Sequence, residues 1–299
     1  MRVAITGGTG FLGRYVAEAI KNEGMVPVII TRTEPNDLDC LDEYCVTDYT
    51  EENLTKVLED IDAVVHLAAK RATDSKIDSY KENEIITQNL YNACCRVDVK
   101  NIVYASTISV YSKKECLPWN EGQLPDPYSL YGISKLGCEY IGNLYSKKGL
   151  KIKNLRLAHL FGFNEKNNYM INKFFRQAHN KKQLMLDAKG VALREFLYAK
   201  DAASAIVCAL KKEDLSGTLN IGSEEALTNQ QVAETINKVF NNEGNLVIGE
   251  DLNEGITSSF MSSKKAEDIL GYRAKYSFES AVKEISCLME EMEDVPILY

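Results

Sequence analysis

The sequence has no apolar run long enough to cross a membrane, and its first residues have the pattern of a β-strand rather than of a signal peptide. Its eight cysteines include no C-x-x-C pair and no spacing typical of metal ligands. We therefore expect reduced, mostly buried cysteines, no bound metal and a cytoplasmic protein that makes no contact with membranes.

Positive charge is also scarce, since 35 lysines and arginines face 43 acidic residues and give a net charge of −8. Binding of nucleic acid usually needs a basic surface, so this balance argues against a nucleic-acid partner. An anionic ligand would have to be held by a few local arginines and lysines. With 299 residues, 45% of them hydrophobic, the chain is long enough to bury a substantial core.

Strand-like and helix-like segments alternate through the first half of the chain. The expected strands are 2–6, 26–31, 44–46, 63–69, 101–105 and 151–157, and the expected helices are 11–22, 53–58, 82–97 and 134–146. The strands are almost continuously apolar, which is typical of a parallel sheet covered on both faces. The pattern predicts an α/β fold with a doubly wound parallel sheet of the Rossmann type.

After about residue 156 the pattern becomes less regular. Helices are expected at 169–179, 201–210, 228–240 and 277–292, with caps at Asp201 and Thr228, and a strand at 219–221. We expect a smaller mixed α/β domain over the carboxyl ends of the sheet, where such folds bind ligands. The predicted domains are a dinucleotide-binding domain at 1–155, with part of 196–222 returning to it, and a mainly substrate-binding domain at 156–299.

A glycine turn directly follows the first expected strand. Gly7, Gly10 and Gly13 are spaced three apart, and an expected helix begins at Phe11. Glycines let the backbone turn sharply and approach a phosphate, while the helix N-terminus offers free N–H groups and the positive end of its dipole. The segment therefore predicts a site for a dinucleotide pyrophosphate, although a purely structural turn would have the same pattern.

Tyr131 and Lys135 form a second pattern, four residues apart at the start of an expected helix. This spacing places both side chains on one helix face. A neighbouring lysine favours the phenolate, so a tyrosine could act as a base near neutral pH. Ser106 and Thr107, at the end of the fifth strand, could donate a hydrogen bond to an oxygen that is oxidised or reduced. The alternative is a simple helix start with a solvated lysine.

Taken together, these motifs resemble the extended short-chain dehydrogenases/reductases, within their nucleotide-sugar epimerase/dehydratase family. The matching segments are TGGTGFLG at 6–13, HLAA at 66–69, VYASTISVY at 103–111, YGISK at 131–135, LRLAHLFG at 155–162, REFLYAKD at 194–201 and LNIGS at 219–223. The resemblance implies that Thr107, Tyr131 and Lys135 are catalytic. It also implies a cofactor site formed by Gly7, Gly10, Phe11, Leu12, Gly13, Arg32, Asp48, Tyr49, Leu67, Ala68, Ala69, Asn83 and Lys135, and substrate contacts from Ser106, Thr107, His159 and Arg194.

The identity of the cofactor is left open between NAD and NADP. The family suggests NAD, and its NAD-preferring members place an acid at the end of the second strand. Arg32 occupies that place here, and a guanidinium suits a 2′-phosphate. Glu34 or Asp37 could instead serve the ribose.

Two further departures from the family bear on the reaction. Family dehydratases follow the catalytic threonine with Asp-Glu, whereas this chain has Ile108 and Ser109, which cannot act as general acids or bases. The segment 252–255 lacks the arginine that grips the second phosphate in many epimerases. Possible substitutes are Lys173, Arg176 and Arg273. Trp119 either covers the sugar or anchors its loop.

We therefore expect a nucleotide-sugar 4-epimerase that acts on a UDP-hexose or UDP-N-acetylhexosamine by transient oxidation at C4. The alternative is an NADP-dependent reductase of a keto sugar or a related carbonyl. A non-catalytic dinucleotide sensor is disfavoured, because sensing does not need an activated phenolate. The helices at 82–97 and 134–146 could form the face of a homodimer.

Overall fold

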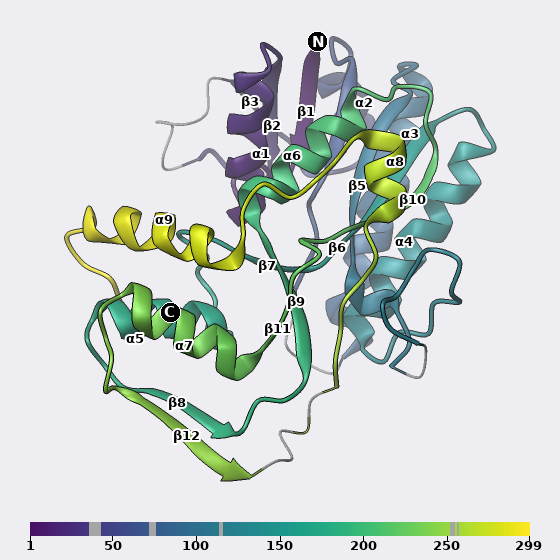
Figure 1. Ribbon diagram of the computed structural model, residues 1–299. Coiled ribbons are helices and arrows are strands. Elements are labelled where there is room, and N and C mark those ends of the chain that lie inside the picture. Colours follow the sequence, from purple (N-terminus) through teal and green to yellow (C-terminus); the bar gives the residue numbers. More distant parts are fainter. Residues whose placement is uncertain (36–42, 72–75, 114–115, 252–254, 256) are drawn as a thin grey trace.

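The computed structural model describes residues 1–35, 43–71, 76–113, 116–251, 255 and 257–299 (Figure 1). Its main element is a seven-stranded sheet in the order β10-β6-β5-β4-β1-β2-β3, in which every pairing is parallel. The strands are β1 (Arg2–Thr6), β2 (Val26–Thr31), β3 (Glu43–Val46), β4 (Ala63–His66), β5 (Asn101–Thr107), β6 (Lys151–Leu157) and β10 (Gly217–Ile221). The expected Rossmann-type fold is confirmed.

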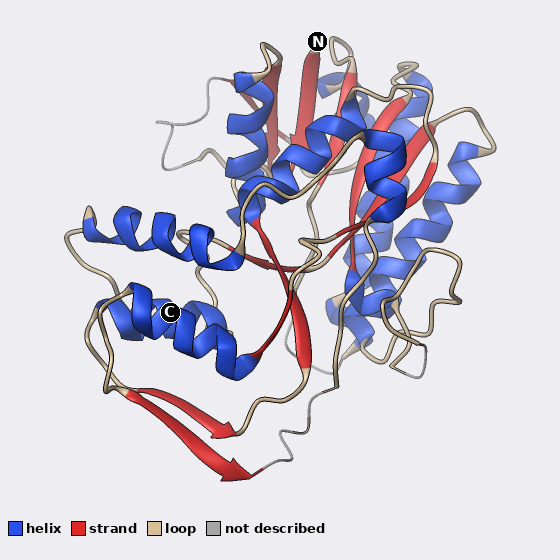
Figure 2. Cartoon of the chain, viewed as in Figure 1, coloured by secondary structure: helices blue, strands red, loops and turns tan. Residues whose placement is uncertain are grey.

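Helices cover both faces of this sheet, as Figure 2 shows. On one face α1 (Phe11–Asn22) packs beside α6 (Ala199–Leu210), and on the other lie α2 (Glu51–Val57), α3 (Lys81–Arg96) and α4 (Leu130–Ser146). The central strands β4 and β5 are buried at every residue, because apolar side chains that alternate between two covered faces all leave water. The carboxyl ends of the strands remain open to the site described below.

Part of the second half of the chain returns to this sheet. Helix α6 covers it beside α1, β10 pairs with β6 at its edge, and α8 (Lys264–Leu270) packs against β10. This arrangement is in line with the expected return of part of 196–222, although the domain limits at 155 and 156 stay a prediction.

The remaining elements form a smaller region with its own core (Figures 1 and 2). It contains two short sheets, β11-β9-β7 and β12-β8. Helices α5, α7 and α9 lie together against them, and their core is rich in phenylalanine. The bounds are β7 (His159–Phe161), α5 (Met170–His179), β8 (Leu184–Ala188), β9 (Leu193–Tyr198), β11 (Ala226–Thr228), α7 (Asn229–Val239), β12 (Leu246–Asp251) and α9 (Phe278–Glu290).

The two expected helix caps have different outcomes. Thr228 caps α7, where its side chain and that of Gln231 form a reciprocal capping box. The expected cap at Asp201 is wrong, because α6 begins two residues earlier. The Asp201 carboxylate instead accepts hydrogen bonds from the backbone N–H groups of Lys275 and Tyr276, at 2.9 and 3.2 Å, and so ties α6 to the segment before α9.

The cysteines are less buried than expected. Cys94 and Cys138 are buried, whereas Cys95, Cys116 and Cys287 are exposed, and none of the described cysteines forms a disulfide. Cys40 lies outside the described residues. Among the helices of the described part of the chain, none is both long and apolar enough to span a membrane.

Candidate active site

A cavity of about 1040 Å³ opens at the carboxyl ends of β1, β2, β4, β5 and β6. Segments of the smaller region, around β7, β9 and the start of α5, form its far wall. All the sequence-predicted site residues line it except Asp48, so the fold brings together Gly7, Gly10, Phe11, Leu12, Gly13, Arg32, Tyr49, Leu67, Ala68, Ala69, Asn83, Ser106, Thr107, Tyr131, Lys135, His159 and Arg194.

The glycine turn (residues 7–13) forms one wall of the cavity. Gly7 has a φ of +71°, and a Cβ there would lie 2.8 Å from the backbone nitrogen of Ala68. A Cβ on Gly13 would lie 2.5 Å from the Cα of Gly8. No side chain can therefore be added at either position without moving the backbone. The turn holds the end of β1, the loop after β4 and the first turn of α1 in close contact.

The turn and the helix that follows it fit a dinucleotide pyrophosphate. Helix α1 begins after Gly10, which has no side chain to cap the helix, and its first turn contains no acidic residue. Its first N–H groups and its positive dipole end therefore face the cavity without a competing side chain.

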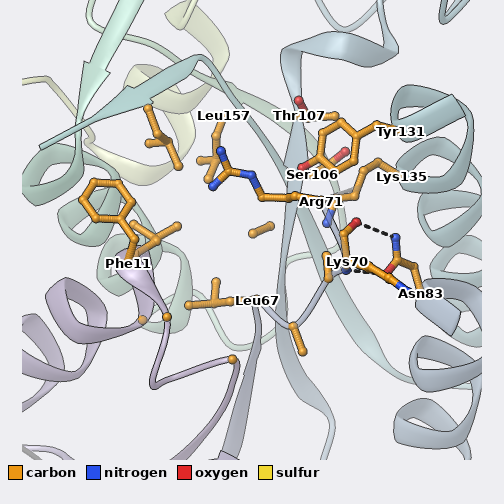
Figure 3. Close-up of a pocket in the computed structure, with 18 of the residues that line it drawn as sticks. Phe11, Leu67, Lys70, Arg71, Asn83, Ser106, Thr107, Tyr131, Lys135 and Leu157 are labelled. Atoms are coloured by element: carbon orange, nitrogen blue, oxygen red, sulfur yellow. Dashed lines mark hydrogen bonds between the residues drawn. The ribbon is translucent and has the colours of Figure 1, made fainter. Parts of the chain in front are cut away.

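Thr107, Tyr131 and Lys135, here called the Tyr131 cluster, lie on the opposite wall (Figure 3). Thr107 ends β5, while Tyr131 and Lys135 lie in the first two turns of α4, whose N-cap is Ser129. Figure 3 shows these side chains beside Ser106, across the cavity from Phe11. The parallel-sheet topology thus places the end of β5 and the start of α4 side by side at the cavity.

Burial shifts the pKa values of Lys135 and Tyr131 in the Tyr131 cluster. Burial lowers the pKa of Lys135 to about 8, and its Nζ atom lies 4.3 Å from the centre of the Tyr104 ring. Burial raises the pKa of Tyr131 above its usual value, and the main opposing influence is the guanidinium of Arg71. Arg71 is thus a cation that favours the Tyr131 phenolate in this structure, while the expected effect of Lys135 on Tyr131 stays a prediction.

Arg71 was not singled out from the sequence. It follows the end of β4, and Figure 3 shows its side chain extending across the cavity between Phe11 and the Tyr131 cluster. Its Nη1 atom lies 3.5 Å from Oε2 of Glu165, and its guanidinium lies near the ring of Tyr169. A signal existed, because the loop that follows the carboxyl end of a central strand lies at the ligand-binding edge of the sheet, and Arg71 lies in the loop after β4.

Asn83 fixes the loop that carries Arg71. Its Oδ1 atom accepts a hydrogen bond of 2.7 Å from the backbone N–H of Lys70, and its Nδ2 atom donates to Ser134 of α4 at 3.1 Å. One side chain of α3 therefore connects the loop after β4 with the helix of the Tyr131 cluster. Asn83 therefore holds these two segments of the site together.

A buried ion pair supports the site from behind. Glu139 and Arg156 are almost fully buried and are joined by two hydrogen bonds, of 3.0 and 2.8 Å. The Ser106 hydroxyl, next to Thr107, donates to the same carboxylate. Removal of either partner would leave a buried charge without compensation, so the ion pair is held in place. Glu139 in turn holds the Ser106 hydroxyl through its hydrogen bond. Sequence reasoning gave Ser106 a substrate contact only.

The far wall contributes His159 and Arg194. Nε2 of His159 lies 3.0 Å from the hydroxyl of Ser259, and burial lowers the pKa of this imidazole to about 3. His159 is therefore neutral at physiological pH and can only exchange neutral hydrogen bonds. Arg194 is the second residue of β9 and lines the same cavity.

At the end of the cavity next to β2, the surroundings of Arg32 and the position of Asp48 differ from those expected from the sequence. Nη2 of Arg32 lies 2.5 Å from Oε1 of Glu82. Asp48, expected to contact adenine, lies outside the lining, and its carboxylate accepts hydrogen bonds from Thr50 and Asn53 at the start of α2. These hydrogen bonds lower the pKa of Asp48 to about 2, and the residue that caps α2 is Thr50, whose side chain accepts from the backbone N–H of Asn53. Glu34 is not part of the lining, and Asp37 lies outside the described residues.

The proposed substitutes for the missing arginine do not reach the cavity. Arg176 donates to backbone oxygens of Glu165, Asn167 and Ile297, and Arg273 pairs with Glu267. Lys173 is not in the lining either, and most of the motif 252–255 lies outside the described residues.

Trp119 anchors its loop. It is buried, its ring stacks on Tyr111 with centres 5.4 Å apart, and its backbone N–H donates to Phe260. Since Trp119 is not among the lining residues, the structure favours the anchoring role over contact with a sugar.

Comparison with known proteins gives consistent matches. The model of the NAD dependent epimerase/dehydratase family matches residues 3–222. The chain is 56% identical to UDP-N-acetylglucosamine 4-epimerase from Bacillus cereus, with a TM-score of 0.93 over 100% of both chains. It also resembles the UDP-glucuronic acid 4-epimerase of Bacillus cereus in complex with UDP-glucuronic acid and NAD, at 24% identity and a TM-score of 0.83, covering 97% of this chain and 100% of that one.

A sequence match comes from Bacillus subtilis. The protein named uncharacterized UDP-glucose epimerase YtcB is 26% identical over 293 residues, which cover 91% of this chain and 92% of that protein. The family model alone spans well over half of the chain, and the glycine turn and the Tyr131 cluster both lie within its limits. The chain therefore belongs to the NAD-dependent epimerase/dehydratase family.

Proposed function

We propose that this protein is a nucleotide-sugar 4-epimerase whose substrate is UDP-N-acetylglucosamine. The observation that carries the proposal is that the glycine turn and the Tyr131 cluster face each other across one cavity. The identity of 56% over the whole length of a UDP-N-acetylglucosamine 4-epimerase supports the choice of sugar.

The cofactor that we propose is NAD. The glycine turn and the uncapped start of α1 fit a pyrophosphate, and a similar solved structure contains NAD. The argument for NADP depended on Arg32, whose guanidinium is held by Glu82. When bound, NAD supplies the acceptor and donor of a hydride for transient oxidation at C4 of the sugar.

Within this scheme the chain's own residues move the proton. Tyr131 takes the proton of the sugar hydroxyl at C4 and later returns it, which is general base and then general acid catalysis. Arg71 favours the ionised form of Tyr131 against the cost of burial. Thr107 donates a hydrogen bond to the reacting oxygen, and Lys135 holds the nicotinamide ribose.

The charge of the cavity lining suits a UDP-sugar. Its basic residues are Arg32, Lys70, Arg71, Lys135 and Arg194, and among the described residues Glu82 is its only acidic one. We assign Arg194 to the substrate diphosphate, because a guanidinium binds phosphate oxygens in a bidentate manner. His159, which is neutral, is assigned to a hydrogen bond with the substrate.

The same lining speaks against dehydration. Ile108 and Ser109 line the cavity immediately after Thr107, and neither can act as a general acid or base. The lining's acidic residue, Glu82, is paired with Arg32 near β2. Loss of water from the sugar would need a carboxylate close to the Tyr131 cluster.

The direct test is to incubate the purified protein with UDP-N-acetylglucosamine and to follow the sugar by proton NMR. We expect conversion to UDP-N-acetylgalactosamine up to a fixed equilibrium ratio, without consumption of free NADH or NADPH. Stoichiometric loss of the reduced cofactor with a keto-sugar substrate would contradict the proposal and favour the NADP-dependent reductase.

We further propose that the enzyme works in the cytoplasm as a homodimer formed through α3 and α4. Ile85, Ile133, Tyr140 and Leu144 are exposed on these two helices, and apolar side chains gathered on neighbouring helices are typical of an interface. Sedimentation equilibrium that gives the mass of one chain at micromolar concentration would contradict this proposal.

A further inference from the structure

The end of the cavity next to β2 holds an ion pair between two distant segments. Arg32 directly follows β2, and Glu82 lies in the first turn of α3, fifty positions later. Both side chains line the cavity and are about half exposed, at 52% and 44%. The pair therefore lies where a bound ligand can reach it.

Arg32 is held from a second side as well. Its guanidinium carbon lies 5.6 Å from the centre of the Tyr49 ring. That ring is itself fixed, because the Tyr49 hydroxyl donates a 2.8 Å hydrogen bond to the backbone oxygen of Ile30 in β2. The contact with the aromatic face adds to the ion pair, so Arg32 has a defined position.

In Rossmann-type folds, residues at the end of the second strand contact the ribose of the adenosine. A carboxylate there accepts a hydrogen bond from the 2′-hydroxyl of NAD, whereas an arginine accommodates the 2′-phosphate of NADP. This chain has both groups, but the carboxylate comes from α3 instead of the strand.

The remainder of the lining makes Glu82 unusual. The other charged residues of the lining, within the part of the chain that the structure describes, are lysines and arginines, as expected for a site that binds phosphates. An acid at this one end weakens the attraction for an anion there. A 2′-phosphate, with close to two negative charges, would have to displace Glu82 from Arg32 and then lie beside an uncompensated carboxylate.

We propose that Glu82 determines the cofactor preference of this enzyme, because it occupies Arg32 and provides the acceptor for the 2′-hydroxyl of NAD. The inference rests on the proposed function, since it concerns the cofactor of that same site. It also explains how an arginine at the end of β2 is compatible with NAD.

Equilibrium dialysis tests the proposal. Protein stripped of bound nucleotide is dialysed against equal concentrations of NAD⁺ and NADP⁺, and both bound species are quantified by liquid chromatography. Wild type should bind mainly NAD⁺. Glu82→Gln should move the bound ratio toward NADP⁺ by about tenfold or more, because Arg32 becomes free for the phosphate.

Arg32→Gln should have the opposite effect and move the bound ratio further toward NAD⁺, since Glu82 then lies unpaired where the phosphate would bind. Glu52→Gln is the matched control. It also removes one negative charge, but Glu52 lies on α2 outside the cavity and pairs with Lys56. Its ratio should equal that of wild type, and thermal unfolding of each variant checks that it is folded.

A ratio within about threefold of wild type for folded Glu82→Gln would overturn the inference. A shift toward NADP⁺ in Arg32→Gln would overturn it too, and this variant decides the matter if Glu82→Gln does not fold. Failure of the wild type to bind either dinucleotide would contradict both the proposed function and this inference. Binding of NAD⁺ without epimerase activity would contradict the proposed function alone.

Discussion

The glycine turn on one wall of the cavity works through backbone, whereas the Tyr131 cluster on the other wall works through buried polar side chains. At Gly7 and Gly13 the space for a side chain is already filled by backbone atoms. On the opposite wall, Lys135, Glu139 and Arg156 are ionisable side chains that are almost completely withdrawn from water.

This difference indicates what each wall can tolerate. The glycine turn depends on close approach, so added volume should damage it while changes of charge should matter little. The Tyr131 cluster depends on shifted pKa values, so substitutions of nearly equal size should abolish its chemistry while leaving the packing intact. Substitutions of each kind can therefore separate binding of the cofactor from catalysis.

The largest expected effect is that of Tyr131→Phe, which should abolish catalysis while it leaves binding of the cofactor intact. Removal of the hydroxyl should lower kcat by about 10²- to 10⁴-fold, because the proton has no other base. Affinity for NAD⁺ should change little, since the glycine turn is untouched. Steady-state kinetics and isothermal titration on the same preparation check both halves. Unchanged turnover would show that the base is misassigned.

The reverse experiment is Gly13→Ala, which should damage the glycine turn. Its Cβ would meet backbone atoms of Gly8 at 2.5 Å, so we expect affinity for NAD⁺ to fall by about 10- to 100-fold and stability by about 1–3 kcal/mol. Gly137→Ala is the control, because in α4 its Cβ would lie 3.5 Å from the nearest atom. That variant should be slightly more stable, by about 0.5–1 kcal/mol.

Lys135→Met should lower activity and at the same time raise the stability of the folded protein. Burial lowers the pKa of Lys135 from 10.5 to about 8, so the charged form destabilises the folded state at pH 7. We expect loss of activity together with a gain in unfolding free energy of about 1–3 kcal/mol at pH 7. The gain should shrink as pH rises from 8 to 10.5, because wild-type Lys135 then loses its proton in the folded state. A gain that is independent of pH in urea unfolding would contradict the burial argument.

The smallest expected effect concerns the pH profile of Arg71→Met. The guanidinium opposes the raised pKa of Tyr131, so its removal should raise that pKa further. The rising limb of kcat/KM should therefore move to higher pH, with a several-fold loss of activity near pH 7 and recovery at higher pH. Arg71→Lys, which keeps the charge, should retain most of the wild-type profile. A loss of equal size at every pH would instead indicate a role in binding alone.

The elements of the large parallel sheet were predictable from the sequence, whereas the strands of the two small sheets were not. The strands at 2–6, 26–31 and 151–157 and the helix at 11–22 have the expected limits, because continuous apolar runs and helical spacing are local properties. The strands β7, β8, β9, β11 and β12 were missed, although β9 and β12 are as long as β2. Their pairing depends on partners distant in sequence.

For the site, the sequence predicted which residues gather but not how their charges are paired. The cavity collects nearly all the expected residues, because motifs at strand ends and helix starts converge in this fold. Arg32 is paired with Glu82, and the charge of Arg71 acts on Tyr131; no local sequence pattern specifies either interaction. Asp48 lies outside the lining and is hydrogen-bonded to Thr50 and Asn53, so its contact with adenine stays a prediction.

The most direct test of the central claim, transient oxidation at C4, uses UDP-N-acetylglucosamine with deuterium at C4 in ordinary water. We expect UDP-N-acetylgalactosamine that keeps the deuterium at C4, because a hydride held within the cavity returns to the same carbon. Loss of the label to water at the rate of epimerisation would contradict the account.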